Sequence, residues 1–244
     1  MILGLIPSRL NSTRLRNKPL LNIDGLPIIV HTLKRALLSK KLDKVIVCTD
    51  SKKIVDVVKK YGGKALLTSK KHQNGTERIA EVAKKFNAKL VVDIQGDEPL
   101  VDPKDIDKVI DFHVKNQNFD IVVPSMISKT NPKSKHLVKV IFNKSGKILY
   151  FSRALIPFNF RNNKAIYYKD LSIVSFLPKA LKTFANSKMT YLEKIEGIEL
   201  LRALEINLSL GTFISKGTSF SVDVNDDLLK AIDIMPNNPI RKKY

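Results

Sequence analysis

Residues 90–100 read LVVDIQGDEPL, and this stretch decides the fold. An apolar run, typical of a buried strand, leads into a polar loop that carries Asp97 and Glu98. Open α/β sheets bind their ligands at the carboxyl edge of the strands. A carboxylate there can hold a divalent cation, which prefers hard oxygen ligands and recruits phosphates. The alternative is that both carboxylates only cap the helix expected near Pro103, because acidic residues often precede helices.

The first segment of the chain adds a basic loop to this picture. Residues 1–20 read MILGLIPSRLNSTRLRNKPL, in which residues 2–6 fit a buried strand that ends at Pro7. The loop that follows carries Arg9, Arg14 and Lys18, and such side chains form charge-assisted hydrogen bonds with phosphate oxygens. It matches neither GxxxxGK[ST] nor GxGxxG, so it is not a P-loop. It either binds a polyanion such as a triphosphate or is a solvated basic surface.

Strand and helix patterns alternate through the first half of the chain, which predicts a mostly parallel α/β sheet. We expect strands at residues 2–6, 44–48, 90–93 and 121–124, and helices near 27–38, 52–61, 76–86 and 106–113. The rhythm then changes, because 138–142 and 148–151 read as antiparallel strands joined by the turn-rich tetrad 143–146. A helix at 192–204 and a closing strand at 220–224 are expected to return to the sheet.

These patterns predict one domain in three parts. Residues 1–126 form the nucleotide-binding core, residues 127–190 form an inserted antiparallel lobe for substrate and dimer contacts, and residues 191–244 return to the core. A chain of 244 residues, 43% hydrophobic, is long enough to bury a sizeable core in this way.

Several short motifs together resemble a known family. They are P-x-R-x-x-S-T-R-L-x-x-K-P-L at residues 7–20, T-D at 49–50, H-Q-x-G-T-E-R at 72–78, Q-G-D-E-P at 95–99, Y-F-S-R-A-x-I-P at 150–157 and V-D at 222–223. In this order they resemble 3-deoxy-manno-octulosonate cytidylyltransferases, also called CMP-Kdo synthetases. The resemblance covers nearly the whole chain, and six ordered motifs are much more specific than any one of them.

The resemblance implies a Rossmann-like nucleotidyltransferase sheet and a Mg²⁺-dependent reaction. The anomeric hydroxyl of a 2-ulosonic acid, Kdo in this family, attacks the α-phosphate of CTP, and CMP-sugar and pyrophosphate form. This activation serves lipopolysaccharide or capsule synthesis. The family is typically homodimeric, so we expect a homodimer whose substrates are CTP and the sugar acid.

The resemblance also assigns roles to individual residues. Lys18, Asp97 and Asp223 match catalytic positions, and the two aspartates match the ligands of Mg²⁺. Without the resemblance, Asp223 reads as a cap of the last helix, and Glu77 with Arg78 reads as a surface ion pair of little energetic value. The expected nucleotide-binding residues are Ser8, Arg9, Arg14, Lys18, Asn74, Gly75, Arg78 and Gln95.

The expected sugar-binding residues depart most from the family pattern. Asp170 and Val174 stand where the family typically has His and Tyr, and Leu200 stands where it has Gln, whereas Arg153 and Glu196 are retained. These replacements leave a second substrate open, such as 8-amino-Kdo or a nonulosonic acid, because polar sites reject analogues that leave their groups unpaired. Alternatively, Arg153 and Asp170 form an internal salt bridge.

Composition limits the other classes of function. The single Cys48, the lack of a signal-peptide pattern and the lack of an apolar run of membrane-spanning length predict a cytoplasmic enzyme. A net charge of +20 raises nucleic-acid binding by a non-catalytic relative as a competing hypothesis. The lysines are spread along the chain in pairs and aromatics make up only 7%, so we expect solvated helix faces and no nucleic-acid partner.

Overall fold

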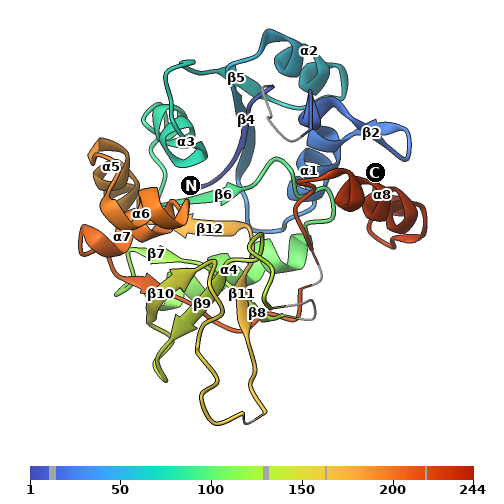
Figure 1. The fold of residues 1–244 in the computed structure, drawn as a ribbon. Helices are drawn as coiled ribbons and strands as arrows, with labels where there is room; N and C mark the ends of the chain where they lie inside the picture. The colour runs from blue at the N-terminus through green and yellow to red at the C-terminus, as the bar shows by residue number, and fades with distance from the viewer. Residues whose placement is uncertain (11–14, 129–131, 163, 218) are drawn as a thin grey trace.

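A seven-stranded sheet forms the centre of the computed structural model, which describes residues 1–10, 15–128, 132–162, 164–217 and 219–244 (Figure 1). Its strands lie in the order β13-β7-β12-β6-β1-β4-β5. Their bounds are β1 Ile2–Ser8, β4 Lys44–Thr49, β5 Ala65–Leu67, β6 Leu90–Ile94, β7 Ile121–Val122, β12 Ile173–Phe176 and β13 Leu210–Gly211. Only β12 pairs antiparallel with its neighbours. The predicted mostly parallel α/β sheet is therefore confirmed.

The strand order places a crevice at the carboxyl ends of β1 and β6. The chain builds the sheet outward from β1, through β4 and β5 on one side and through β6 on the other. Such a reversal of direction separates the loops that follow the two central strands, and ligands of open α/β sheets bind in the gap. The basic loop after β1 and the carboxylate loop after β6 thus meet at one edge.

Helices cover both faces of this sheet and bury its apolar side chains. The helices α1 (Ile28–Ala36), α2 (Lys52–Lys60) and α4 (Pro103–Lys115) pack on one face. The helices α3 (Gly75–Ala83), α5 (Pro178–Asn186) and α7 (Leu200–Glu205) pack on the other. Figure 1 shows α5, α6 and α7 grouped together, away from α1 and α2.

A second sheet is antiparallel and has the order β10-β9-β11-β8. Its strands are β8 Ser125–Ile127, β9 Lys139–Phe142, β10 Ile148–Ser152 and β11 Tyr168–Asp170. The predicted pairing of β9 with β10 is confirmed, and their turn ends at Gly146, whose φ of 78° suits a residue without a side chain. The chain rejoins the central sheet at β12, earlier than the expected residue 191. The division into three parts stays a prediction.

The single helix predicted at 192–204 is wrong. The structure has two short helices there, α6 (Tyr191–Glu196) and α7, and Gly197 between them has a left-handed φ of 62°. The Gly197 amide donates to the Glu193 carbonyl and ends α6. The apolar spacing continues across the break because both helices pack on the same core, so periodicity alone did not reveal it.

The closing strand predicted at 220–224 is also wrong, since no strand is assigned to these residues. Their apolar and polar side chains do alternate, as in a strand, and Val222 is fully buried. However, the segment makes its contact with the carboxylate loop through one backbone hydrogen bond, from Val222 N to Asp97 O at 2.9 Å, and through serine side chains. It is an extended segment held largely by side chains.

The remaining elements surround the crevice and the C-terminus. They are η1 Lys18–Leu20, the hairpin of β2 Asn22–Ile23 and β3 Leu26–Pro27, α8 Asn225–Ile234, η2 Met235–Asn237 and η3 Arg241–Lys243. The last residues return to α1, where Tyr244 Oη lies 2.9 Å from His31 Nδ1. Among the described residues, no helix has the length and apolar character needed to cross a membrane.

A buried ion-pair network joins α3, α6 and α7. The Arg202 guanidinium lies 2.6 Å from Glu193 Oε1 and 3.3 Å from Glu77 Oε1, and Arg202 is only 1% exposed. Glu77 belongs to the first turn of α3, beside the crevice, so this network attaches the start of α3 to the helices that follow β12.

We expect Arg202→Ala to lower the free energy of unfolding by about 3–5 kcal/mol, because it leaves the buried Glu193 carboxylate without its partner. Urea unfolding followed by circular dichroism measures this change. The matched control is Lys41→Ala, which removes an exposed pair with Asp111 and should cost less than about 1 kcal/mol. Equal losses in the two variants would contradict the role of the network.

Candidate active site

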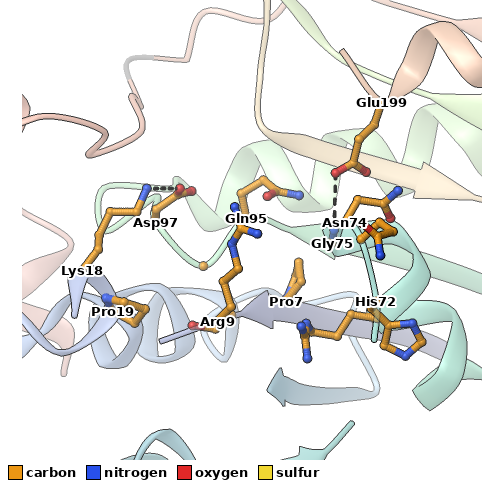
Figure 2. A pocket seen from close by; sticks show the side chains of 14 residues that line it. Pro7, Arg9, Lys18, Pro19, His72, Asn74, Gly75, Gln95, Asp97 and Glu199 are labelled. Carbon is orange, nitrogen blue, oxygen red and sulfur yellow. Dashed lines mark hydrogen bonds and ion pairs between the residues drawn. The ribbon is translucent and has the colours of Figure 1, made fainter. Parts of the chain in front are cut away.

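A cavity of about 240 Å³ opens at the carboxyl ends of β1 and β6. The loops after both strands line it, together with the start of α3 and Glu199 from the beginning of α7 (Figure 2). Its lining includes these predicted site residues: Ser8, Arg9, Lys18, Asn74, Gly75, Arg78, Gln95 and Asp97. Arg14, another predicted nucleotide contact, lies outside the described residues.

Two carboxylates and one ammonium group meet at the edge of this cavity. Lys18 Nζ lies 2.6 Å from Asp97 Oδ2 and 3.1 Å from Asp223 Oδ1. Burial works to lower the pKa of Lys18, but the charges and hydrogen bonds of Asp97 and Asp223 outweigh it, and the pKa is raised. Three residues far apart in the sequence are thus brought together, as the prediction for Asp97 and Asp223 requires.

The start of α3 is held by a set of side-chain hydrogen bonds. Asn74 Oδ1 accepts from Glu77 N at 2.8 Å, and Glu77 Oε2 accepts from Gln73 N at 2.9 Å. Glu199 accepts from Gly75 N at 3.3 Å and from the Thr76 hydroxyl at 2.7 Å. Glu77 therefore does more than form a surface ion pair, because it fixes the loop that precedes α3.

Gly75 brings the backbone into close contact with the strand before the basic loop. A Cβ at this position would lie 3.2 Å from Pro7 Cγ and 4.0 Å from Gln95 Nε2. Glycine therefore lets the start of α3 pack closely on Pro7 while the Gly75 amide donates to Glu199.

Arg78 forms part of the floor of the cavity and is only 4% exposed. Its guanidinium donates to Asp50 Oδ2 at 3.1 Å and to the Thr68 hydroxyl at 2.5 Å. Asp50, from the T-D motif after β4, thus forms an ion pair with Arg78 and fixes the orientation of its guanidinium in the cavity wall.

The buried Asp93 and the partly buried Glu199 are carboxyl groups that the sequence analysis missed as part of the site. Asp93 is 1% exposed, and its Oδ2 accepts from Gln95 Nε2 at 2.9 Å. Burial, and then the charges of Glu199 and Asp97, raise the pKa of Asp93 well above its usual value. Burial likewise raises the pKa of Glu199. The signal in the sequence that could have identified Asp93 is its position as a charged residue inside the otherwise apolar strand β6.

The five predicted sugar-binding residues do not line the cavity. Val174 and Leu200 are buried in the apolar core between the sheet and α3, α5 and α7. Asp170 ends β11, and burial raises its pKa. No ion pair joins Arg153 to Asp170 in the described part of the chain, so the alternative of an internal salt bridge between them is wrong.

Arg153 and Glu196 instead hold each other. Glu196 accepts from Arg153 N at 2.8 Å and from the Ser152 hydroxyl at 2.6 Å. The Arg153 guanidinium donates to the carbonyl oxygens of Lys135, Glu196 and Gly197. These contacts join β10 to the end of α6.

Comparison with known proteins identifies the class. A family model described as cytidylyltransferase matches residues 3–210. A solved structure of CMP:2-keto-3-deoxy-manno-octonic acid synthetase complexed with CTP is 31% identical and gives a TM-score of 0.92, covering 97% of this chain and 98% of the other. Sheet, site and family model together define a cytidylyltransferase.

Curated relatives narrow the class further. The 3-deoxy-manno-octulosonate cytidylyltransferase of Thermodesulfovibrio yellowstonii is 39% identical over 241 residues, which cover 92% of this chain and 94% of the relative. The enzyme of the same name from Rickettsia canadensis is 38% identical over 238 residues, or 96% and 95% of the two chains. The chain belongs to the 3-deoxy-manno-octulosonate cytidylyltransferase family.

We expect Asp93→Asn to change how stability depends on pH. Because the pKa of Asp93 is raised in the folded state, protonation of Asp93 stabilises the fold. This stabilisation is complete below the pKa of Asp in the unfolded chain, about 3.9, and it is lost as pH rises through the folded pKa. The Asn side chain does not titrate, so the variant does not lose this stabilisation. The free energy of unfolding of the variant minus that of wild type should therefore increase with pH. Urea unfolding at pH 5 to 9 measures the difference, with Asp111→Asn as an exposed control. Parallel profiles for wild type and Asp93→Asn would contradict the buried-carboxyl interpretation.

Proposed function

We propose that this enzyme transfers the cytidylyl group of CTP to Kdo. The anomeric hydroxyl oxygen of Kdo forms a bond with the α-phosphorus, the bond between that phosphorus and the β-phosphate oxygen breaks, and pyrophosphate leaves while the hydroxyl proton is released. The observation that carries this proposal is the convergence of Asp97, Asp223 and Lys18 at the edge of a cavity whose walls contain Arg9 and Arg78.

The basic side of the cavity suits the triphosphate. Ser8 ends β1 at the crevice, Arg9 follows it, and Lys18 approaches from the start of η1. In Figure 2 the Lys18 side chain reaches Asp97, and the Arg9 side chain points toward Gln95. A bound triphosphate gives Lys18 a second set of anionic partners, so its ammonium can hold phosphate oxygens near the aspartates.

The residues present fit Mg²⁺ as a cofactor. The carboxylate oxygens of Asp97 and Asp223 lie around one position, and the positively charged Lys18 ammonium contacts both of them there. No group of three or more His, Cys, Asp or Glu side chains suited to a metal occurs among the described residues. Two carboxylates are what Mg²⁺ uses when phosphates and water complete its shell. When bound, it would neutralise charge that develops on the phosphates.

The other end of the cavity suits the cytosine ring. Asn74, Gly75 and Gln95 present amide groups there, and Arg78 forms the floor. The hydrogen bonds that Glu77 and Glu199 accept from backbone amides fix this loop before substrate binds, which lowers the entropy cost of binding.

For the sugar acid, the contacts Arg153, Asp170, Val174, Glu196 and Leu200 stay predictions, although Val174 and Leu200 are buried in the apolar core. Arg153 would have to exchange its carbonyl partners for the carboxylate of the sugar acid. A different sugar acid such as 8-amino-Kdo is not favoured, because the relatives at 38–39% identity carry the name of the Kdo enzyme. Use of the product in lipopolysaccharide or capsule synthesis, and a cytoplasmic location, remain predictions.

We expect wild type to release pyrophosphate from CTP in the presence of Kdo and Mg²⁺, and Asp97→Asn to slow this release at least 100-fold. The change removes one anionic oxygen from the proposed cation site while it keeps the size of the side chain. A coupled pyrophosphate assay gives kcat and KM, and circular dichroism checks the fold. Full activity in Asp97→Asn would contradict the cation assignment, and no turnover of Kdo by wild type would contradict the proposed substrate.

Exposed apolar side chains support the expected homodimer. Phe158 and Phe160, between β10 and β11, are 78% and 84% exposed, and Leu149 and Ile166 nearby in sequence are also exposed. Figure 1 shows this segment extending away from the two sheets. Apolar side chains grouped on a surface mark interaction sites more often than single ones do.

We expect wild type to elute as a dimer and the double variant Phe158→Ser, Phe160→Ser to shift toward a monomer, because the change removes apolar area that only association can bury. Size-exclusion chromatography with light scattering measures the mass. Leu229→Ser, an exposed apolar residue on α8, is the control. A variant that remains fully dimeric would contradict this placement of the interface.

A further inference from the structure

Glu98 is a buried carboxyl group directly beside the proposed cation ligand Asp97. It is only 4% exposed. Its Oε1 accepts from the Ser221 hydroxyl at 2.7 Å, and its Oε2 accepts from the Ser219 hydroxyl. The Ser172 hydroxyl also contacts Glu98, and it lies 3.3 Å from the Ser221 hydroxyl. We call Glu98 with these three serines the serine cluster.

The serine cluster joins three segments that are distant in the sequence. Glu98 belongs to the loop after β6, Ser172 to the turn between β11 and β12, and Ser219 and Ser221 to the extended segment before α8. Backbone bonds support the same junction, because Ser172 O accepts from Gln95 N at 3.2 Å and Asp97 O accepts from Val222 N at 2.9 Å.

Asp223 takes its position from this junction. It follows Ser221 and Val222, and Val222 packs in an apolar cluster with Leu100. On its other side, Asp223 N donates to Asp227 Oδ2 at 2.9 Å, at the start of α8. The residues that precede Asp223 are thus held by their hydrogen bonds to Glu98. The distance between the Asp97 and Asp223 carboxylates depends on these hydrogen bonds.

The chemistry of the cluster indicates positioning more than simple packing. A buried carboxylate is costly unless its oxygens are hydrogen-bonded, and no cation is paired with Glu98 in the described chain. An apolar side chain of similar size would fill the space at lower cost but would give no directional contact with the serines. Hydrogen bonds set both distance and orientation, which a cation site requires of its ligands.

We propose that Glu98 is the positioning residue of the cation site: through Ser219 and Ser221 it sets Asp223 opposite Asp97, and through Ser172 it attaches this pair to the turn that follows Asp170. The proposal rests on the proposed function, since it assumes that Asp97 and Asp223 hold Mg²⁺. It adds a role for a residue that need not touch substrate or metal.

The decisive experiment compares Glu98→Leu with Glu98→Gln. Leu removes every hydrogen bond of the cluster, whereas the Gln amide oxygen still accepts from one serine and its NH2 group donates to the hydroxyl of another. We expect Leu to weaken binding of Mn²⁺ alone, followed by electron paramagnetic resonance, by about 10–100-fold, the range typical of residues that orient metal ligands. We expect Gln to restore most of the affinity.

A second readout is the Mg²⁺ concentration that gives half-maximal pyrophosphate release. It should rise in Glu98→Leu by a similar factor, while KM for CTP at saturating Mg²⁺ changes less. The matched control is Asp105→Asn. Asp105 is 3% exposed and accepts from the Ser215 hydroxyl at 2.7 Å, so it holds the chain at Ser215, outside the serine cluster. The Asp105→Asn variant should be less stable than wild type but keep its Mn²⁺ affinity within about twofold, because the substitution removes no contact of the serine cluster.

Each result supports or overturns the proposal. Unchanged Mn²⁺ affinity and Mg²⁺ requirement in a folded Glu98→Leu protein would overturn it, and so would an equal loss in Asp105→Asn. If Glu98→Leu does not fold, the double variant Ser219→Ala, Ser221→Ala decides by the same two readouts. Wild type that shows no Mn²⁺ binding and no Mg²⁺ requirement would instead remove the cation site itself, and the positioning role with it.

Discussion

The ion pair of Lys18 with Asp97 and Asp223 is the interaction on which the rest of the site depends. Two carboxylates that converge at a partly buried edge repel each other unless a positive charge lies between them. Lys18 supplies that charge, at 2.6 and 3.1 Å from the two groups. Under the proposed function, a divalent cation held by the two carboxylates would supply the same positive charge, and the phosphates of the triphosphate would be the partners of Lys18. The ion pair therefore holds the two aspartates close together, as the proposed cation site requires.

Three further carboxyl groups lie around this ion pair: Asp93 and Glu98 are buried, and Glu199 is partly buried. Burial raises the pKa of each, and each accepts hydrogen bonds from a loop of the site: Asp93 from Gln95, Glu98 from serines before α8, and Glu199 from the start of α3. Such groups reduce stability relative to apolar ones. Their concentration at one edge of the sheet indicates that the loops are held in place for function at some cost in stability.

The local sequence predicted most of the fold because the helices and strands of the core follow their own periodicities. The strands β1, β4 and β6 and the helices α1 to α4 lie close to where the apolar spacing placed them. The two errors have one physical cause. At Gly197 a left-handed backbone conformation ends a helix although the apolar spacing of the sequence continues. Around Val222 the sequence alternates as in a strand, but the segment is held by side-chain hydrogen bonds and does not pair with a neighbouring strand. In both places the contacts that decide the backbone come from distant residues.

The sequence by itself determined the class of sheet, the carboxylate loop after β6 and the basic loop after β1, because these follow from short-range patterns and from the order of the motifs. Only the tertiary structure decided which groups meet. It placed Asp223 beside Asp97 through Glu98, made Glu199 a partner of Gly75, and buried Val174 and Leu200 in the core. Hydrogen bonds and burial depend on distances between residues far apart along the chain, and those distances exist only after the sheet has brought the loops to one edge.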